Sequence, residues 1–501
     1  MFLSQALAIT LVISPGIGMG LKAASFGNAD LNESKLTRTD TTVNFNWGKG
    51  APTSKIGSDR LSLSTSGKTY YVSENGDDKN DGLRHTTPFR TLQRAANQVT
   101  TPGDKVYVMN GTYTRADTSK EILVIYDKHG TPTTPITFKA YHGHRPVIKS
   151  QNPYAINVVG SSYIVIDGLE LVGNNDNVTL VYAQQQKDNI HNPLTNGAGI
   201  ALHPSFVGGI IKQYSHHIVI RNNKISKFGA GAIGAFRTDY VTIENNLIFK
   251  NCLYSSTGAN TITTLHNWNY DDNTTDYKMI IRGNTVYDNR SLIPWKVSGT
   301  IAESNGIMID DALNTQKNSI LKPYRGKTLI ENNIVYNNGA AGIQVFKSPN
   351  VDVINNTTYQ NSHNSTTQYL GEIAVVMTNN VRVFNNIMYA KKNGIVNHVN
   401  KADNNVKFDY NLIYNSSKFT SSEPHNIIGQ NPLFVDIGYR NFSLKLGSLA
   451  IDAGTSAFNG VQAPKIDKRG ASRPQDGNGN GDARIDIGAF EARSPLAAKA
   501  F

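Results

Sequence analysis

Short segments in which apolar and polar residues alternate recur from about residue 160 to residue 415. They share the form apolar-x-apolar-x-Asn-Asn-x-apolar-x-aromatic or apolar, as in "TIENNLIFKNC" at 242 and "LIENNIVYNNG" at 329. Alternation with a period of two places successive side chains on opposite faces of an extended chain, which predicts β-strands. Each Asn-Asn pair marks a turn between strands, because asparagine tolerates left-handed backbone.

A regular spacing links these segments. With the second asparagine of each pair as a marker, the steps are 23, 38, 49, 23, 30 and 25 residues. The markers are Asn223, Asn246, Asn284, Asn333, Asn356, Asn386 and Asn411. A base step of 23 residues with insertions is typical of a solenoid and is too short for a crossover helix in every unit. We therefore predict an all-β right-handed parallel β-helix solenoid, with marker asparagines hydrogen-bonded from coil to coil.

The composition agrees with this architecture. Hydrophobic residues make up 39% of the chain and charged residues only 17%, and Asn, Thr, Ser and Gly fill the difference. Such a chain favours short strands and tight turns over long amphipathic helices. A leucine-rich repeat, the competing solenoid, would need more leucines and a helical half-repeat. Cys252 is the only cysteine, so no internal disulfide can support the fold.

We expect four segments along the chain. Residues 1–29 are predicted to be a secretory signal peptide and leader, with cleavage after Ala24 or Ala29, because the first residues are apolar and then turn polar. Residues 30–67 are a flexible N-terminal segment, 68–450 the β-helix domain, and 451–501 a C-terminal capping segment and tail. No second apolar run is long enough to span a bilayer. We therefore expect a secreted or periplasmic protein that acts as a monomer.

The net charge is strongly positive but dispersed. The formal charge is +11 and the sequence pI is about 9.3, without a Lys/Arg run of the kind that binds nucleic acid. A dispersed positive field attracts polyanions. We predict a polysaccharide partner, anionic in character, and no nucleic-acid partner. Solubility alone is the alternative reason for the charge.

Both ends of the predicted solenoid resemble a known group of proteins. Residues 69–113 include "PFRTLQRAANQV", and residues 473–491 read "RPQDGNGNGDARIDIGAFE". These stretches resemble secreted parallel β-helix proteins of the pectate-lyase-like superfamily, in particular family-nine pectate lyases and parallel β-helix β-xylosidases. The resemblance implies that "PFRTLQRAANQV" forms a short helix capping the first coil. It implies little about the reaction, because this superfamily contains lyases, hydrolases, epimerases and adhesins.

The two longest steps, 38 and 49 residues, lie between Asn246 and Asn333. Solenoids place insertions on one face, usually the face that binds a ligand. Trp268 and Trp295 in these insertions suit stacking on sugar rings, and we predict that they bind substrate together with Lys296. A role as cover for the flank of the solenoid is an equal alternative for both tryptophans.

Ionisable residues line up when the strands before the later turns are aligned. The last aligned position holds Arg237, His266, Asp311 and Lys347, and the position before it holds Phe236, Leu265, Asp310 and Phe346. Coils of a β-helix lie about 4.8 Å apart, so this register brings the four ionisable groups within reach of one another. We predict a catalytic site formed by Lys347, Arg237, His266, Asp311 and Asp310. The alternative is an exposed charged ladder that discourages edge pairing.

Two groups of aspartates are candidate calcium ligands. One is Asp271, Asp272 and Asp276, and the other is Asp310 and Asp311. Calcium takes oxygen ligands and would offset the repulsion between neighbouring carboxylates. Family-nine pectate lyases carry a comparable cluster of two adjacent aspartates with a third close behind, together with a lysine base. Neither group reproduces that spacing. Ca²⁺ is therefore a candidate cofactor, and solvated loops are the alternative.

The leading functional prediction is a secreted lyase that cleaves a uronate-containing, pectate- or alginate-like polymer by β-elimination. Lys347, assisted by the charge of Arg237, would take the proton from C5, and His266 is a second candidate base. Arg237 or bound calcium would neutralise the substrate carboxylate.

Three alternatives remain open. In a glycoside hydrolase similar to the β-helix β-xylosidases, Asp310 would be the nucleophile. Glu303 or Asp272 would then supply the second carboxyl, because the aligned segment 344–347 has none. A uronate C5-epimerase needs nearly the same groups as a lyase. A non-catalytic surface adhesin would bind without turnover.

Overall fold

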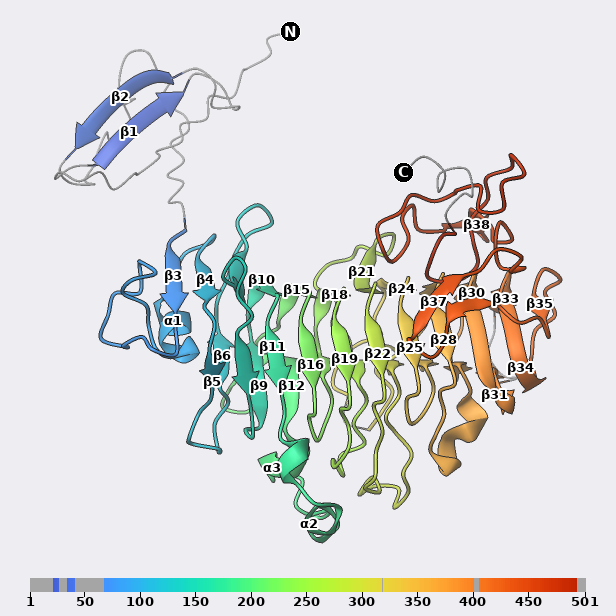
Figure 1. Cartoon of the computed structure of the whole chain (residues 1–501). Helices are drawn as coiled ribbons and strands as arrows, with labels where there is room; N and C mark the ends of the chain where they lie inside the picture. Colours follow the sequence, from blue (N-terminus) through green and yellow to red (C-terminus); the bar gives the residue numbers. More distant parts are fainter. Residues whose placement is uncertain (1–20, 27–33, 41–66, 318, 401–404, 493–501) are drawn as a thin grey trace.

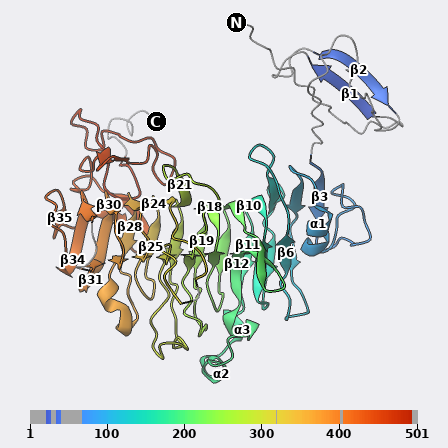
Figure 2. The same cartoon turned by 180° about the vertical axis from the view of Figure 1, so that it is seen from behind.

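The structure is a computed structural model, which describes residues 21–26, 34–40, 67–317, 319–400 and 405–492. Its main body is a stack of coils that contribute strands to three parallel sheets (Figures 1 and 2). The first and second sheets have 11 strands each and the third has 9. The predicted all-β right-handed parallel β-helix is confirmed.

The strands of each sheet follow the order of the coils. The first sheet contains β3 (Thr69–Val72), β4 (Lys105–Val108), β7 (Ile136–Ala140), β10 (Ser162–Asp167), β15 (His216–Arg221), β18 (Asp239–Glu244), β21 (Tyr277–Arg282), β24 (Lys327–Glu331), β27 (Val351–Ile354), β30 (Val381–Phe384) and β33 (Val406–Asp409). The second contains β5 (Thr112–Tyr113), β8 (Val147–Lys149), β11 (Glu170–Val172), β16 (Lys224–Ser226), β19 (Leu247–Phe249), β22 (Thr285–Tyr287), β25 (Ile334–Tyr336), β28 (Thr357–Tyr359), β31 (Ile387–Ile395), β34 (Leu412–Lys418) and β35 (Ile427–Ile428). The third contains β6 (Leu123–Tyr126), β9 (Tyr154–Val159), β12 (Ala198–His203), β17 (Ile233–Phe236), β20 (Ile262–Leu265), β23 (Ile307–Asp310), β26 (Ile343–Phe346), β29 (Ile373–Val376) and β32 (Asn397–Val399).

The remaining elements lie at the ends of the stack and in its insertions. The helices are α1 (Leu92–Gln98), α2 (Leu180–Gln185), α3 (Pro193–Asn196), and the 3₁₀ turns η1 (Asn175–Asn177) and η2 (Ser365–Leu370). The antiparallel pairs are β1 (Leu21–Phe26) with β2 (Ser34–Asp40), β13 (Ser205–Val207) with β14 (Ile210–Gln213), β36 (Phe434–Asp436) with β37 (Asn441–Leu444), and β38 (Ala457–Phe458) with β39 (Val461–Gln462).

Identical side chains stack inside the coils. On six successive coils of the third sheet, isoleucines occupy paired positions and are fully buried: Ile200, Ile233, Ile262, Ile307, Ile343 and Ile373. Alternate residues of each strand point inward, so the isoleucines of successive coils stack into one continuous apolar column. Burial of this column is the main driving force for folding.

The marker asparagines form the predicted ladder. The Nδ2 group of each marker donates to the Oδ1 atom of the next one at 3.0–3.1 Å, from Asn223 to Asn411 and on to Asn426. The residue before the marker takes left-handed backbone, with φ of 57° at Asn222 and 55° at Asn245. Each Asn-Asn pair therefore combines a turn residue with a ladder residue, as the sequence predicts.

A second ladder escaped the sequence analysis. Its members lie five residues after four of the markers and are joined by Nδ2 to Oδ1 hydrogen bonds of 2.8–3.0 Å: Asn251, Asn289, Asn338 and Asn361. The ladder ends at Glu372, whose two carboxyl oxygens accept from the backbone N–H and the Nδ2 of Asn361 at 2.9 and 2.6 Å. The repeated asparagine at this offset is the signal that could have revealed it.

Helix α1 covers the first coil. Thr91 is its N-cap, and its hydroxyl accepts from the N–H of Arg94 at 3.2 Å. Leu92, Ala95 and Ala96 of α1 are buried. The helix therefore shields the apolar end of the stack, as the sequence predicts.

The C-terminal segment folds back along the flank of the stack, over the later coils (Figure 1). Phe442 packs on Tyr336, with ring centroids 5.3 Å apart. The Nδ2 of Asn355 donates to the carbonyls of Asp486 and Gly488 at 2.8 and 3.0 Å. The segment thus ties several coils together, and the proposed boundary at residue 451 stays a prediction.

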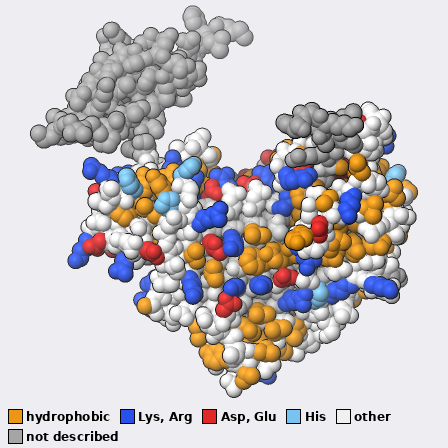
Figure 3. Space-filling view, viewed as in Figure 1, with side chains coloured by type: hydrophobic (Ala, Val, Ile, Leu, Met, Phe, Trp, Pro, Cys, Tyr) orange, Lys and Arg blue, Asp and Glu red, His pale blue; other side chains and the backbone are white. Residues whose placement is uncertain are grey.

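β1 and β2 fall within the predicted leader and the predicted flexible segment. Residues 1–20, 27–33 and 41–66 lie outside the described residues, so the signal peptide, its cleavage site and secretion stay predictions. The expected monomer also stays a prediction. Among the described residues, no helix is long and apolar enough to cross a membrane. On the face shown in Figure 3, basic side chains are scattered among acidic ones.

Candidate active site

A groove of about 400 Å³ lies over the outer face of the third sheet, across β9, β12, β17, β20 and β23. Its floor consists of small residues on successive strands, Ala201, Gly234 and Thr263. A Cβ on Gly234 would lie 2.5 Å from the ring of Phe236. The glycine therefore lets this ring lie close to the sheet. Asp310, the last residue of β23, lines the groove from the coil farthest along the stack.

Insertions between the second and third sheets form one wall of the groove. Ile190 and Asn196 come from the insertion at 173–197, which carries α2 and α3 and projects from the stack (Figure 1). Residues 257–260 come from a second insertion. A third insertion supports it, because a Cβ on Gly258 would lie 2.9 Å from the indole of Trp295. The two long steps thus border the groove, whereas the insertion at 173–197 precedes the first marker and was missed.

Two carboxyl groups at this groove have strongly raised pKa values. Burial, with the charge of Asp311 adding to it, raises the pKa of Asp310 to about 7. The Nε2 of Gln316 donates to Asp310 at 2.7 Å and, with Lys347, opposes that rise. Burial also raises the pKa of Glu303 to about 7, with a further contribution from the charge of Asp310. Two coupled carboxyls that titrate near neutrality are suited to proton transfer.

Asp311 and His266 form a buried contact beside Asp310. Asp311 is fully buried, and its oxygens accept from the N–H and hydroxyl of Thr315 and from the N–H of Gln316 at 2.7–3.0 Å. The Nε2 of His266 lies 3.2 Å from an Asp311 oxygen. Burial lowers the pKa of His266, and the charge of Arg237 adds to this effect while Asp311 opposes it. Asp311 therefore fixes the loop after β23, and His266 is a neutral neighbour at neutral pH.

Arg237 and Lys347 lie at the two ends of the predicted column. The aligned residues Phe236, Leu265, Asp310 and Phe346 pair strand by strand, so the predicted register is observed. Arg237 and Lys347 are three coil spacings apart, about 14 Å along the axis. The Lys347 Nζ lies 5.6 Å from the centre of the Phe346 ring. Lys347 therefore lies on the coil next to Asp310, and Arg237 lies at the opposite end of the column.

The predicted substrate-binding residues lie in different walls. Trp295 backs the wall at Gly258 and Lys296 donates through Nζ to the carbonyl of Asp188 at 2.8 Å. Trp268 lies on the opposite side, stacked on Tyr214 with ring centroids 4.3 Å apart. Sugar binding by these three residues stays a prediction.

The acidic loop before β21 is bound internally. Asp271 accepts from the Tyr240 hydroxyl at 2.8 Å and from the Lys278 Nζ at 2.9 Å. Asp272 pairs with Arg325, and Asp276 accepts from the Nδ2 of Asn273 at 2.8 Å. Among the described residues, no three His, Cys, Asp or Glu side chains gather as metal ligands.

The carboxylates present therefore do not fit the expected calcium site. Asp311 has its oxygens occupied by the loop that follows it, and Asp310 and Asp271 belong to separate clusters. Calcium binding by Asp310, Asp311, Asp271, Asp272 and Asp276 stays a prediction without support from the geometry.

A buried charge network behind this loop escaped the sequence analysis. The Nζ of Lys278 lies 2.5 Å from Asp239 and 2.9 Å from Asp271, and the side chain of Lys278 is fully buried. The Tyr324 hydroxyl donates to Asp239 at 2.7 Å. This network joins the loops at 266–276 and 311–326 to the stack. A lysine inside the apolar strand "YKMIIR" was the only signal of it in the sequence.

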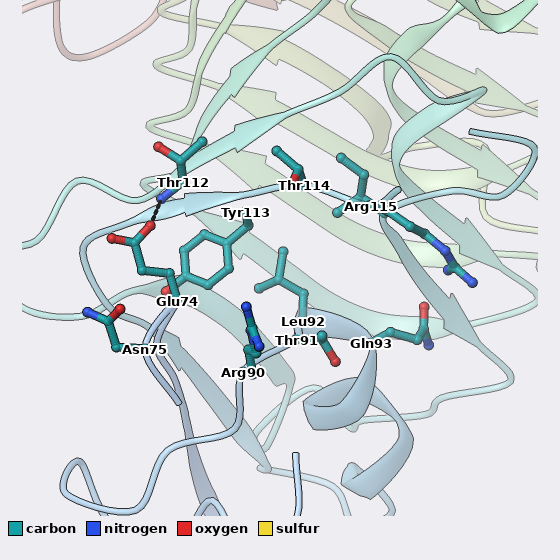
Figure 4. A pocket seen from close by; sticks show the side chains of 11 residues that line it. Glu74, Asn75, Arg90, Thr91, Leu92, Gln93, Thr112, Tyr113, Thr114 and Arg115 are labelled. Atoms are coloured by element: carbon teal, nitrogen blue, oxygen red, sulfur yellow. Dashed lines mark hydrogen bonds between the residues drawn. The ribbon is translucent and has the colours of Figure 1, made fainter. Parts of the chain in front are cut away.

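Another cavity, of about 540 Å³, lies at the capping helix (Figure 4). In Figure 4, Arg90 and Thr91 at the start of α1 face Glu74 and Thr112 across it. Glu74 accepts from the N–H of Thr112 at 2.6 Å. Its carboxyl thus holds the first coil together. The groove at Asp310 therefore remains the candidate active site, because the raised carboxyl pKa values are found there.

The coils, the capping helix and the groove define a parallel β-helix protein. Residues 70–393 match the family described as "Pel9A-like, right handed beta helix region", and this match covers more than half of the chain. The protein belongs to this family. The predicted resemblance to pectate-lyase-like β-helix proteins is thereby confirmed.

Individual relatives are distant. The uncharacterized protein YwoF of Bacillus subtilis (strain 168) is 39% identical over 88 residues, which is 17% of this chain and 17% of that protein. A pectate lyase Pel9A structure is 17% identical with a TM-score of 0.47 and covers 86% of this chain and 97% of its own. XylC in complex with xylose is 12% identical with a TM-score of 0.48, covering 85% and 98%. Likeness at this level concerns the course of the chain alone.

Proposed function

We propose that the protein is a lyase that cleaves a uronate-containing polysaccharide by β-elimination in the groove over the third sheet. The observation that carries this proposal is Asp310, which lines the groove and whose pKa is raised to about 7. Lys347 is close enough for its charge to oppose that rise. Asp310 lines one end of the groove, and Lys347 follows Phe346, which pairs with Asp310 on the next coil, so the two residues are the proposed acid and base.

The reaction needs a base and an acid, and a cation helps to hold the anionic chain in the groove. Lys347 takes the proton from C5, next to the substrate carboxylate. Asp310, protonated below about pH 7, gives its proton to the glycosidic oxygen as the bond to C4 breaks. The products are a C4=C5 double bond on one fragment and a hydroxyl group on the other. Arg237, about 14 Å from Lys347 along the axis, binds the carboxylate of a sugar residue farther along the chain.

Two further features support an anionic polymer as substrate. The formal charge of +11 attracts polyanions. The family is described as Pel9A-like, and the Pel9A structure reported above is that of a pectate lyase, whose name refers to a polymer of this class. A polymer of this kind is met outside the cytoplasm, which agrees with the predicted signal peptide. Together these features favour elimination over hydrolysis.

The experiment is a panel of pectate, alginate and xylan assayed for two products. Elimination creates an ultraviolet-absorbing double bond with each new reducing end, whereas hydrolysis creates reducing ends alone. We expect absorbing product from a polyuronate, because only a uronate has the acidic C5 proton. Epimerisation would change the sugar without cleavage, and an adhesin would bind without either product. Each of these outcomes would refute the lyase proposal.

Replacing Lys347 tests the role of the base. Lys347→Ala should lower the rate of double-bond formation by about 10²–10⁴-fold, the usual contribution of a general base. Lys392→Ala is the matched control, because Lys392 is an exposed lysine on the second sheet. A Lys347→Ala enzyme with the wild-type rate would remove Lys347 from the mechanism.

A glycoside hydrolase is the second candidate, and Glu303 favours it. The sequence alignment offered no second carboxyl on the coil after Asp310, but the structure brings Glu303 into electrostatic contact with Asp310. Two coupled carboxyls are what glycoside hydrolysis requires. A wild-type enzyme that produces reducing ends without ultraviolet absorbance would be a hydrolase. Loss of this activity in Glu303→Gln would assign Glu303 to the reaction.

A further inference from the structure

A site lined by two stacked aromatic rings lies outside the Asp310 groove, where the chain leaves β14 and β20. Tyr214 follows β14, and Trp268 follows β20; their rings stack with centroids 4.3 Å apart and planes 10° apart. Both rings line a cavity of about 680 Å³. The other lining residues come from Asn269 and from the loop after β23: Ile320, Leu321, Lys322, Pro323 and Arg325. Three segments distant in sequence therefore build one site.

The site is held rigidly. The N–H of Trp268 donates to the Thr238 carbonyl at 3.1 Å. The side chain of Asn269 bridges to the opposite loop, accepting from the Arg325 N–H at 2.9 Å and donating to the Pro323 carbonyl at 3.0 Å. The buried Lys278 network anchors both loops from behind. A preorganised aromatic surface loses little conformational entropy when it binds a ligand.

Its charge is suited to an acidic ligand. Lys322 and Arg325 are exposed at the cavity, and Arg325 is paired with one exposed carboxylate, Asp272. Burial raises the pKa of Tyr214, and the charge of Arg237 opposes this rise. Arg237 follows Phe236, which lines the groove, so a third cation lies on the groove side of the aromatic pair.

We propose that the Tyr214–Trp268 pair, with Lys322 and Arg325, is a second binding site for the polysaccharide and recognises an acidic sugar residue outside the Asp310 groove. An aromatic face packs against the C–H face of a pyranose ring, and the two cations pair with its carboxylate. The proposed occupant is a polyuronate chain that contacts both the groove and this site. This inference rests on the proposed function, because that proposal supplies the polymer.

The test measures binding separately from cleavage. Native electrophoresis through gels containing pectate, alginate or neutral xylan reports affinity as retardation. We expect wild-type protein to be retarded by a polyuronate more than by xylan. Trp268→Ala and Lys322→Glu should each weaken this binding by roughly tenfold. Tyr439→Ala is the matched control and should change nothing, because Tyr439 is 90% exposed on the C-terminal segment.

Each outcome separates the two proposals. Weakened binding in both variants without any unsaturated product from the wild type would retain this site and refute the lyase. Wild-type binding in both variants would refute the site, whatever the cleavage assay shows. Lys322 is exposed, so Lys322→Glu remains informative if Trp268→Ala fails to fold. Equal retardation by xylan and polyuronate would refute recognition of an acidic sugar.

Discussion

At the scale of single residues, Asp310 shows how burial prepares a group for chemistry. Its carboxyl keeps one hydrogen bond, from Gln316, and has two neighbours of opposite effect, Asp311 and Lys347. Removal from water disfavours the charged form and brings the pKa to about 7. The adjacent Asp311 has three hydrogen-bond donors and fixes the loop. Two identical residues side by side thus have different roles because of their contacts.

The pKa of Asp310 predicts a pH dependence. If Asp310 acts as the acid, it must be protonated, so the ratio of the wild-type rate to the Asp310→Asn rate should fall about tenfold per pH unit above pH 7, because deprotonation of the base affects both enzymes alike. Asp310→Asn should lower the rate by about 10²–10⁴-fold. Initial rates between pH 5 and 9 provide the measurement, with Asp436→Asn on exposed β36 as the control. A ratio of wild-type to Asp310→Asn rates that rises through pH 7 would instead identify Asp310 as a base or nucleophile.

At the scale of elements, the asparagine ladders show what sequence analysis can predict. The first ladder was predictable, because each of its asparagines sits in a recurring strand–turn pattern. The second ladder repeats at a constant offset but lies in irregular turns, so periodicity of strands did not reveal it. The capping helix α1 was predictable from a local motif. Insertion 173–197 was not, because it precedes the first recognisable repeat.

The candidate site was predictable only in part. The register of Arg237, His266, Asp311 and Lys347 follows from strand alignment, and it is observed. Glu303, named in the sequence analysis as one of two candidate second carboxyls, precedes β23, and its charge and that of Asp310 influence each other. The Lys278 network joins residues up to 85 positions apart. Such contacts depend on how separate segments pack together, and the alternation of apolar and polar residues within one strand does not predict this packing.

Glu372, at the end of the second ladder, predicts a pH-dependent stability. Burial raises its pKa from 4.5 to about 8. The folded state therefore holds a proton that the unfolded state releases above pH 4.5, so stability falls as pH rises from about 5 to 8. Between these limits, Glu372→Gln should gain roughly 2–4 kcal/mol relative to wild type. The amide introduced by Glu372→Gln faces Asn361, and any cost of this contact is the same at every pH. The gain is therefore read from the change in the stability difference with pH.

Urea unfolding at pH 5 and pH 8 measures this difference. Glu170→Gln serves as the control, because Glu170 forms a partly exposed pair with Lys224 on the second sheet. The same stability difference between Glu372→Gln and wild type at both pH values would show that Glu372 titrates normally in the folded protein.

At the scale of the whole molecule, the C-terminal segment acts across coils. Residues Ile451, Ile487, Ala489 and Ala492 are buried in one cluster with residues of the second sheet such as Ile387 and Leu412. Arg473 and Glu491 form a fully buried ion pair beneath it. A solenoid otherwise has contacts only between neighbouring coils. The segment therefore adds long-range contacts that the repeat itself does not provide.

Removing residues 451–501 should expose this cluster. We expect the truncated chain to aggregate or to melt at a clearly lower temperature, because apolar side chains on the second sheet lose their cover. Size-exclusion chromatography and thermal melting provide the measurements. Tyr439→Ala, an exposed substitution that precedes the removed residues, should behave like wild type. A truncated chain of unchanged size and melting temperature would show that the segment is dispensable.

The direction of the amides in both ladders restricts how such a molecule can change in length. Every Nδ2 points toward the C-terminal end and every Oδ1 toward the N-terminal end. A partial coil would interrupt the ladder and leave a buried Nδ2 group or a buried Oδ1 atom without its hydrogen-bond partner. Growth or shortening is therefore permitted only in complete modules, each bringing one strand for every sheet. The groove would lengthen by the same increments, so its length is counted in coils.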